Sequence, residues 1–338
     1  HLWKKSGVRM AAAMNNLVEI GEAIKRSNRV LLCGHVMPDG DCLGSVLALG
    51  LTLERLGKKV IMGGPDPIPE IYHYLPGLDR FIVGKPPEYE YDTFIVLDCS
   101  IPERLGQGYQ EFLNKDLVLI NIDHHEGSQP FGDYQYTDPK AAAVGEIILD
   151  LLDVMKVQIT IEAAVNLYTA IITDTGSFRY DNTTPGTHRR VALLLEMGIP
   201  ATDINIHLYE EKPLAALKIL GAALDTLTAS PCGRVCWMTI TREILHKAGA
   251  LDEHTDGLIN YARSIKGVEV GLLFREISND LYKISFRSKN SVDVNKLAAS
   301  FGGGGHTRAA GCVLQGDLKT IQEQIITAAM LAAGGAGN

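Results

Sequence analysis

Four apolar segments of this chain each end in carboxylate or imidazole side chains, and no other pattern in the sequence says as much about its chemistry. The segments cover residues 29–33, 94–97, 117–122 and 170–173. The polar side chains that follow them are His35, Asp39, Asp41, Asp98, Asp123, His124, His125 and Asp174. In an open parallel sheet the carboxyl ends of the strands line one crevice, so residues from distant parts of the sequence meet there. We therefore expect these side chains to gather at one edge of a sheet.

Each of these residues also has a simpler interpretation. An aspartate that follows a strand is commonly a helix cap or a turn residue, and a single histidine beside an apolar run is commonly structural. The coincidence of both residue types at four successive segment ends favours a metal site instead. The donors are oxygen atoms and imidazole nitrogens with no cysteine required, which suits Mn²⁺ or Mg²⁺ better than a structural zinc ion.

Length and charge limit the classes of partner. A chain of 338 residues is long enough for two domains. Its formal net charge of −8 offers no electrostatic footprint for long duplex nucleic acid. A carboxylate-rich site repels phosphate until divalent ions fill it, after which the local field reverses its sign. The acidic composition is therefore compatible with a small phosphorylated substrate.

Nothing in the sequence indicates a membrane. The chain has no stretch of about 18 or more apolar residues, so we expect no transmembrane helix. Residues 1–9 are basic, but they are not followed by the long apolar segment of a signal peptide. The six cysteines are few and scattered, which argues against a disulfide framework. We expect a cytoplasmic protein.

Short apolar strands alternate with amphipathic helices in the first part of the chain. This alternation is typical of an α/β fold with a parallel sheet covered by helices on both faces. The expected strands are residues 29–33, 59–63, 94–98 and 117–123, and the expected helices are residues 17–25, 44–56, 141–155, 161–172 and 188–197. Asp138 is expected to be the N-cap of the helix that runs to Met155, with Pro139 as the first helical residue.

The pattern changes after a mostly helical segment, residues 201–227, which we interpret as a connector. Strands are expected at 234–240, 268–276, 281–287 and 312–314, and helices at 294–300 and from Leu318 onward. Asn279-Asp280 lies between two of these strands and predicts a hairpin. The second domain is therefore expected to be smaller and to mix helices with strands.

A glycine run precedes the last expected strand. Gly302 to Gly305 alone is compatible with a flexible linker, but His306, Thr307 and Arg308 follow at once. Glycine lets a phosphate or a base approach backbone N–H groups closely, while histidine and arginine contribute directed hydrogen bonds or charge. Arg287-Ser288 offers another anion contact. The alternative interpretation of these residues is ordinary exposed polarity.

Taken together, these motifs resemble the DHH/DHHA1 phosphoesterases, and within them the nanoRNase type, which hydrolyses short RNA and 3′-phosphoadenosine-5′-phosphate. The motifs are Gly34-His35-Val36-Met37-Pro38-Asp39-Gly40-Asp41, Val96-Leu97-Asp98, Asp123-His124-His125, Thr173-Asp174-Thr175-Gly176 and the run from Gly302 to His306. The resemblance covers nearly the whole chain after the first dozen residues. It implies a catalytic metal-binding DHH domain over 14–200, a helical connector over 201–228 and a substrate-binding DHHA1 domain over 229–338.

The resemblance also implies a set of roles. Two divalent ions are expected, Mn²⁺ in preference to Mg²⁺. The implied ligands are His35, Asp39 and Asp98 for one ion, and Asp41, Asp98, His124 and Asp174 for the other. Asp98 and His125 are the implied catalytic residues, the former as a bridge and the latter facing the substrate phosphate, while Asp123 orients His124 or its neighbours. The implied substrate contacts are Arg104, Arg287, Ser288, Gly304, Gly305, His306 and Arg308.

The implied reaction is hydrolysis in which a hydroxide shared by two metals attacks phosphorus in line, with His125 stabilising charge or protonating the leaving oxygen. Linear or cyclic dinucleotides are an alternative substrate class. A non-catalytic nucleotide-binding or RNA-binding protein is an alternative of another kind, but a pure binder has no physical need for the complete ligand set. A homodimer is compatible with the sequence.

Overall fold

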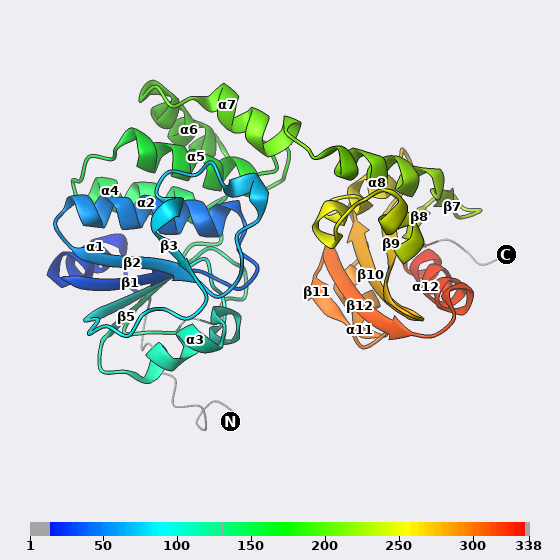
Figure 1. Ribbon diagram of the computed structural model, residues 1–338, viewed down its shortest axis with the longest axis horizontal. Coiled ribbons are helices and arrows are strands. Elements are labelled where there is room, and N and C mark those ends of the chain that lie inside the picture. The colour runs from blue at the N-terminus through cyan, green and yellow to red at the C-terminus, as the bar shows by residue number, and fades with distance from the viewer. Residues whose placement is uncertain (1–13, 130, 335–338) are drawn as a thin grey trace. The chain divides into compact units, whose positions relative to one another are not determined.

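The computed structural model describes residues 14–129 and 131–334, so the basic segment 1–9 lies outside the described residues. The chain separates into two compact units that divide between Glu211 and Lys212 (Figure 1). Among the described residues, no helix combines the length and the apolar character that crossing a membrane requires.

The first unit is built on a six-stranded parallel sheet in the order β3-β2-β1-β4-β5-β6. The strands are β1 (Arg29–Cys33), β2 (Lys59–Gly64), β3 (Phe81–Val83), β4 (Thr93–Leu97), β5 (Val118–Asp123) and β6 (Tyr134–Thr137). Successive side chains of the central strands point to opposite faces, and both faces are buried. The expected parallel sheet is confirmed.

Helices cover one face and shorter turns cover the other. The helices on the first face are α1 (Leu17–Arg26), α2 (Gly40–Arg55), α4 (Val144–Val154) and α5 (Ile161–Asp174), with α6 (Pro185–Glu196) packed outside them. The opposite face is closed by α3 (Gln107–Gln110) and the 3-10 turns η4 (Pro102–Leu105) and η5 (Glu111–Asn114). Figure 1 shows these two layers above and below the sheet. The unit is completed by η2 (Glu70–Tyr72), η3 (Leu78–Arg80), α7 (Ala201–Asn205) and the π-helix η6 (Ile206–Glu210).

Two glycines allow α2 and α5 to approach closely. A Cβ atom on Gly44 would lie 2.4 Å from the backbone oxygen of Asn166, and one on Gly40 would lie 2.4 Å from Oγ1 of Thr173. The start of α2 is thereby held against the end of α5. This contact brings residues 39–41 next to Asp174.

Three details of the expected secondary structure are wrong. Helix α2 begins at Gly40 instead of residue 44, because Oδ1 of Asp39 accepts the N–H groups of Asp41 and Cys42 as an N-cap. Helix α6 begins at Pro185 instead of residue 188, because the hydroxyl of Thr184 accepts the N–H of Thr187 as an N-cap. Asp138 does not cap α4, whose first N–H groups donate to the carboxylate of Asp41 instead.

The second unit contains a mixed sheet in the order β11-β12-β10-β9-β8-β7, in which only β8 and β9 are parallel. Its strands are β7 (Thr228–Ala229), β8 (Val235–Ile240), β9 (Val270–Ser278), β10 (Leu281–Ser288), β11 (Gly304–His306) and β12 (Ala309–Gln315). Its helices are α8 (Leu214–Asp225), α9 (Arg242–Lys247), α10 (Ile259–Ser264), α11 (Val294–Ala299) and α12 (Leu318–Ala332), with the 3-10 turn η7 (Asp252–Thr255). The hairpin at Asn279-Asp280 is confirmed.

The segment expected as a connector is shared between the units. Helix α7 and η6 lie in the first unit, and α8 lies in the second. The domain boundaries expected from the sequence stay a prediction.

Candidate metal centre

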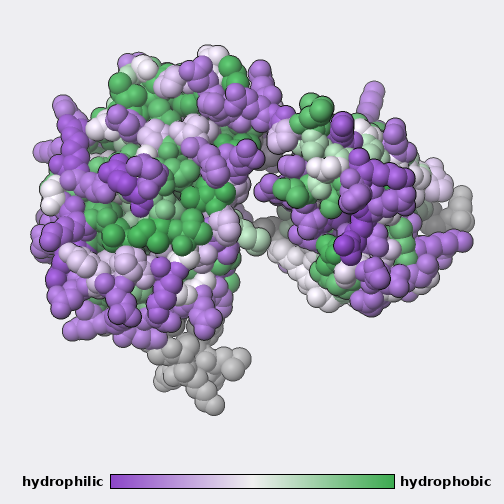
Figure 2. Space-filling model, in the orientation of Figure 1, coloured by the Kyte–Doolittle hydropathy of each residue, from purple (hydrophilic) through white to green (hydrophobic). Residues whose placement is uncertain are grey.

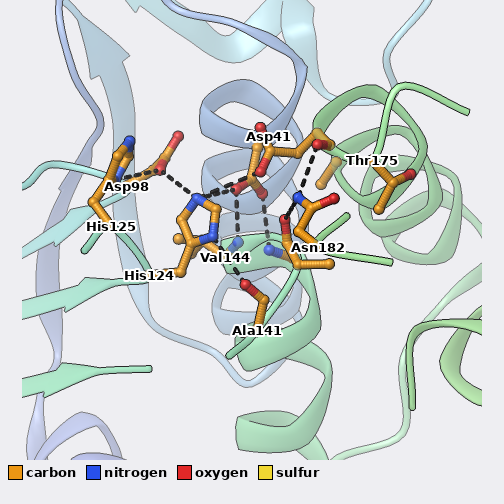
Figure 3. A network of polar contacts seen from close by, with 12 residues as sticks. Asp41, Asp98, His124, His125, Ala141, Val144, Thr175 and Asn182 are labelled. Atoms are coloured by element: carbon orange, nitrogen blue, oxygen red, sulfur yellow. Dashed lines mark hydrogen bonds and ion pairs between the residues drawn. The ribbon is translucent and has the colours of Figure 1, made fainter. Parts of the chain in front are cut away.

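Asp98 lies between His124 and His125 (Figure 3). It follows β4, its side chain is 2% exposed, and its backbone has a φ of 56°, which is rare for a residue with a side chain. Its Oδ2 lies 3.3 Å from Nε2 of His35. Its Oδ1 lies 3.6 Å from Nε2 of His124 and 3.6 Å from Nδ1 of His125. One carboxylate therefore faces histidines from two different strand ends.

His35 and Asp39 lie on one side of Asp98. Nε2 of His35 is 3.8 Å from Oδ2 of Asp39, whose other oxygen caps α2. Nδ1 of His35 is 2.7 Å from the backbone oxygen of Val36 and 3.0 Å from Nη2 of Arg104. These two contacts exclude each other, because the first needs a proton on Nδ1 and the second needs a lone pair there. Ligation of a metal through Nε2 needs the proton on Nδ1, which selects the contact with Val36.

His124 lies on the other side, between Asp41 and Asp174. Its Nε2 is 3.7 Å from Oδ2 of Asp41 and 3.5 Å from Oδ2 of Asp174. Its Nδ1 is 3.1 Å from the backbone oxygen of Ala141, to which it can donate a proton. That contact leaves the lone pair of Nε2 directed at the carboxylates, as a metal ligand requires.

Asp41 is held in place by the start of α4. The backbone N–H of Val144 donates to its Oδ2 at 2.6 Å, and the N–H of Gly145 donates to its Oδ1 at 2.9 Å. Ser45 donates to Oδ1 as well, at 3.1 Å. Burial raises the pKa of Asp41 above its usual value, and the N–H groups at the start of α4 oppose this shift because a helix N-terminus favours a negative charge.

Asn182 is a residue that the sequence reasoning missed. Its Nδ2 donates to the backbone oxygens of Ala142 and Asp174, at 3.0 and 3.1 Å (Figure 3). It thus ties the end of α5 to the loop that orients His124. No pattern in the sequence marks it, because its hydrogen bonds depend on how two distant segments meet.

Asp123 contacts the second histidine of the motif. Nδ1 of His125 donates to Oδ1 of Asp123 at 2.7 Å, and the Asp123 side chain is fully buried. Asp123 was expected to orient His124 or its neighbours, and in the structure it contacts the neighbouring His125. The Nε2 atom of His125 has no hydrogen-bond partner among the described residues.

Electrostatics show how strongly this cluster concentrates negative charge. Burial raises the pKa of Asp98 well above its usual value, and the nearby Asp41 and Asp39 raise it further. Burial and Asp41 raise the pKa of Asp174 to about 8. Burial alone would lower the pKa of His124, but Asp41, Asp98 and Asp174 raise it to about 9. The carboxylates therefore bind protons when no other cation balances their charge.

The donor groups fit divalent cations. Three sets of donor atoms, each within 4.8 Å of one another, consist of His35, Asp39 and Asp98, of Asp41, His124 and Asp174, and of Asp98, His124 and His125. The buried Oδ1 of Asp98 accepts no hydrogen bond from any described group. Oxygen and imidazole donors with one unsatisfied buried carboxylate oxygen are what Mn²⁺ or Mg²⁺ would complete.

The candidate substrate contacts of the second unit gather at one end of its sheet. Arg287 pairs with Ala309 across β10 and β12, and the N–H of Ser288 donates to the backbone oxygen of Arg308. Gly304 and Gly305 lie in β11, which pairs with β12, so the glycine run forms part of the sheet and is not a linker. The hydroxyl of Ser288 is buried without a hydrogen-bond partner among the described atoms. The side chain of His306 lies outside what the structure describes.

Comparison with known proteins matches a known domain family to each of the two units. Residues 29–172 match the DHH family, N-terminal domain, and residues 238–330 match the DHHA1 domain. The bifunctional oligoribonuclease and PAP phosphatase NrnA of Thermus thermophilus is 32% identical over 327 residues, which cover 93% of each chain. The protein of the same name from Bacillus subtilis is 30% identical over 300 residues, covering 87% of this chain and 91% of that one.

The fold has a similar counterpart among solved structures. An exopolyphosphatase-related protein from Bacteroides fragilis superimposes with a TM-score of 0.85 at 25% identity, over 94% of this chain and 95% of that one. Similarity in sequence and in fold thus extends over both units. The chain therefore belongs to the DHH family of divalent-metal-dependent phosphoesterases that carry a C-terminal DHHA1 domain.

Proposed function

We propose that this protein hydrolyses short oligoribonucleotides and 3′-phosphoadenosine-5′-phosphate with two divalent ions, Mn²⁺ in preference to Mg²⁺. The observation that carries the proposal is Asp98, whose two oxygens face His35 on one side and His124 on the other. Relatives named for both activities align over most of the chain. A carboxylate between two groups of donors suits a pair of ions better than a single one.

The ligands would divide around Asp98. One ion would be held by His35, Asp39 and Asp98, and the other by Asp41, Asp98, His124 and Asp174. When bound, the ions supply positive charge that stabilises the phosphoryl oxygens and lowers the pKa of the attacking water. Both imidazoles reach the cluster through Nε2, because their Nδ1 atoms lie against the backbone oxygens of Val36 and Ala141.

His125 is the candidate proton donor. Its Nδ1 donates to Oδ1 of Asp123, whose carboxylate fixes the orientation of the ring. In its doubly protonated form the ring can give the proton of Nε2 to the leaving oxygen of the substrate. Burial tends to raise the pKa of Asp123, but the hydrogen bond and charge of His125 lower it below its usual value, so the carboxylate stays ionised.

Cationic groups of both units would bind the substrate outside the metals. Arg104 stands beside His35 with its guanidinium 3.0 Å from the ring, where it can reach a phosphoryl oxygen. In the second unit, Arg287, Ser288, Gly304, Gly305, His306 and Arg308 are proposed to hold the nucleotide end of the substrate. Backbone N–H groups of the glycine strand permit close approach of phosphate.

Product analysis tests the proposal. Purified protein with Mn²⁺ is incubated with a 5′-labelled RNA trimer, 3′-phosphoadenosine-5′-phosphate, linear pApA or cyclic di-AMP. The expected result is release of mononucleotides from the trimer and of phosphate from the bisphosphate, with EDTA abolishing both. Turnover confined to the dinucleotides would replace the proposal by second-messenger degradation, and binding without turnover would leave a nucleotide-binding protein.

Oligomeric state and location are separate proposals. We expect a cytoplasmic protein, and a homodimer is the proposed assembly. Figure 2 shows hydrophobic residues gathered in one area on the visible face of the first unit, and Leu56 and Val83 are among the exposed apolar side chains, 46% and 48% exposed. The molar mass from light scattering would distinguish a dimer from a monomer of 36.7 kDa.

A further inference from the structure

The loop after Asp174 has an unusual backbone. Gly176, Ser177 and Phe178 have φ values of 54°, 59° and 64°, three successive residues in the left-handed region, two of which carry side chains. Such conformations are uncommon outside glycine and persist where surrounding contacts hold them. Thr175 provides those contacts. Its hydroxyl donates to the backbone oxygen of Ile171 at 2.7 Å and accepts the N–H of Phe178 at 3.2 Å.

This turn presents Arg179 and Tyr180 to solvent a few residues from a candidate metal ligand. The backbone N–H groups of both residues donate to the oxygen of Thr175, at 3.0 and 3.1 Å. Nε of Arg179 donates to the backbone oxygen of Gly176 at 2.7 Å, which fixes the guanidinium. Its Nη groups have no hydrogen-bond partner among the described residues. The arginine is therefore oriented in advance with two donor groups available.

Tyr180 lies over Gly176. A Cβ atom on Gly176 would be 2.3 Å from Cζ of the tyrosine, so the ring packs against the glycine backbone, and Tyr180 is nevertheless 49% exposed. A ring supported on one side and open on the other can accept a second planar group by stacking.

A second tyrosine lies beside this pair. Tyr209, on the π-helix η6, is 37% exposed, and its hydroxyl donates to the backbone oxygen of Ile172 at 3.3 Å. The same backbone oxygen of Ile172 accepts the N–H of Ser177 at 2.8 Å, so Tyr209 lies against the turn that carries Arg179 and Tyr180. The π-helix occurs where it brings Tyr209 to the end of α5, and such helices are frequent at functional sites.

Further tyrosines lie next to Tyr209, on the turn η2 and just after it. Burial and the charge of Asp39 raise the pKa of Tyr72, and Tyr209 adds to this effect. The turn η2 packs against η6, and the ring of Tyr74 stacks on that of His207 with the centroids 4.9 Å apart, so tyrosines continue from Tyr209 toward η2. We call Tyr180, Tyr209 and Arg179 the tyrosine site.

We propose that the tyrosine site binds a nucleotide of the RNA substrate beyond the one whose phosphate is hydrolysed, a step that rests on the proposed function. A nucleobase stacks on Tyr180 or Tyr209, and the Nη groups of Arg179 bind the phosphate that joins it to the next nucleotide. Stacking on aromatic rings accepts every base, so this site would bind RNA without regard to its sequence. Arginine binds phosphate through paired donors and remains charged at all working pH values.

The site has a consequence for substrate length. The bisphosphate 3′-phosphoadenosine-5′-phosphate has a single base and a single sugar, so it cannot occupy the metal centre and the tyrosine site as an RNA trimer does. The tyrosine site therefore favours oligonucleotides over the bisphosphate, and it acts on substrate capture more than on the chemical step.

The test compares kcat/KM for the trimer and for the bisphosphate in the full chain with Mn²⁺. In Tyr180→Ala and in Arg179→Ala, the loss on the trimer is expected to exceed the loss on the bisphosphate by about tenfold, mainly through KM. Tyr180→Phe retains the ring and is expected to restore the trimer activity. Tyr89→Ala and Arg189→Ala remove an exposed tyrosine and an exposed arginine elsewhere in the first unit, and they serve as matched controls.

Binding provides an independent readout. The affinity of a fluorescein-labelled phosphorothioate RNA trimer, measured by anisotropy, should fall by about tenfold in Tyr180→Ala and Arg179→Ala. Equal losses on both substrates, or trimer binding and turnover equal to wild type, would overturn the tyrosine site while the proposed function stands. A wild-type protein inactive on every nucleotide would reject the proposed function instead, and the binding comparison would still decide the tyrosine site.

Discussion

Several side chains of the candidate metal centre have a structural and a ligating role at once. Oδ1 of Asp39 caps α2 while Oδ2 faces His35, and Asp41 binds the first N–H groups of α4 while it lies beside His124. The helix-cap interpretation of these aspartates and the metal interpretation are therefore not alternatives. Substituting either residue would confuse lost helix stability with lost metal binding. Asp98 caps no helix, so it separates the two effects.

Removal of the Asp98 carboxylate is expected to abolish turnover without unfolding the protein. In Asp98→Ala, kcat should fall by about a thousandfold or more, because the group between the two proposed ions is lost. The melting temperature of the metal-free protein should not decrease, because burial and the neighbouring carboxylates already disfavour the ionised form of Asp98. Kinetics and differential scanning fluorimetry with and without Mn²⁺ measure both effects.

Asp116→Ala is the matched control, since that aspartate is exposed and precedes β5, at the end of the strand opposite to Asp123. It should keep both the wild-type rate and the Mn²⁺-dependent rise in melting temperature. Wild-type rates in Asp98→Ala would reject the assignment of this carboxylate to the metals.

The pair Asp123 and His125 should affect the chemical step more than metal binding. In Asp123→Asn the carboxylate that orients His125 through Nδ1 is replaced by an amide, so kcat is expected to fall by about a hundredfold. The melting shift caused by Mn²⁺ should remain, because Asp123 belongs to none of the donor sets. If that shift disappeared with the activity, Asp123 would have to be assigned to the metal centre itself.

At the scale of helices and strands, the contact between α2 and α5 sets the position of the centre. In Gly44→Ala the new Cβ would lie 2.4 Å from the backbone oxygen of Asn166, which a neighbouring helix holds in place. Overpacking of this kind costs about 1–3 kcal/mol, more than the gain of about 1 kcal/mol in helix propensity. We therefore expect a lower free energy of unfolding for the first unit, measured by urea denaturation.

Gly221→Ala provides the opposite case. Gly221 lies inside α8, and a Cβ there would have no atom within 4 Å. Only the propensity term applies, so this variant should gain up to about 1 kcal/mol in the transition of the second unit. A stabilised Gly44→Ala would show that α2 and α5 can separate at little cost, and the close approach would lose its structural importance.

The sequence predicted the elements whose signal is local. Strand β1 was expected at its observed bounds, since a run of buried apolar residues with flanking turns needs no further information. The start of α4 was misplaced because its first N–H groups are satisfied by Asp41, about a hundred residues earlier in the chain. Short edge strands such as β3 and β6 were missed, because pairing with β2 and β5 and not their own pattern defines them.

Some residues of the candidate site could likewise be predicted from the sequence, and others could not. Residues of the metal centre could be predicted because residue type and position at a segment end mark them. Asn182 and the tyrosine site could not, since their contacts arise from backbone atoms of Ala142, Asp174 and Gly176 that meet only in the fold.

At the scale of the whole molecule, the metal centre and its charge belong to one unit. The first unit has its own hydrophobic core on each face of its sheet, and the second unit has separate cores. The donor sets lie entirely within the first unit. Metal binding should therefore stabilise the first unit directly, because a ligand that binds only the folded state raises its stability.

The pH dependence of this stabilisation follows from the carboxylates. The pKa of Asp174 is raised to about 8 by burial and Asp41, and that of His124 to about 9 by Asp41 despite the opposing effect of burial. Folded pKa values above the unfolded ones contribute stability at low pH that is lost as the pH rises through the folded values. The metal-free first unit should therefore be less stable at pH 8.5 than at pH 6.

Metal ions should reverse this trend. At pH 6 the ions must displace protons from Asp174 and His124, whereas at pH 8.5 Asp174 is largely ionised and ready to bind. Calorimetry in EDTA and in MnCl₂ at both pH values should show a larger Mn²⁺-dependent rise in melting temperature at pH 8.5, confined to the transition of the first unit. An equal rise at both pH values would mean that the buried carboxylates are already ionised without metal, and a rise in the transition of the second unit would place the bound ions elsewhere in the molecule.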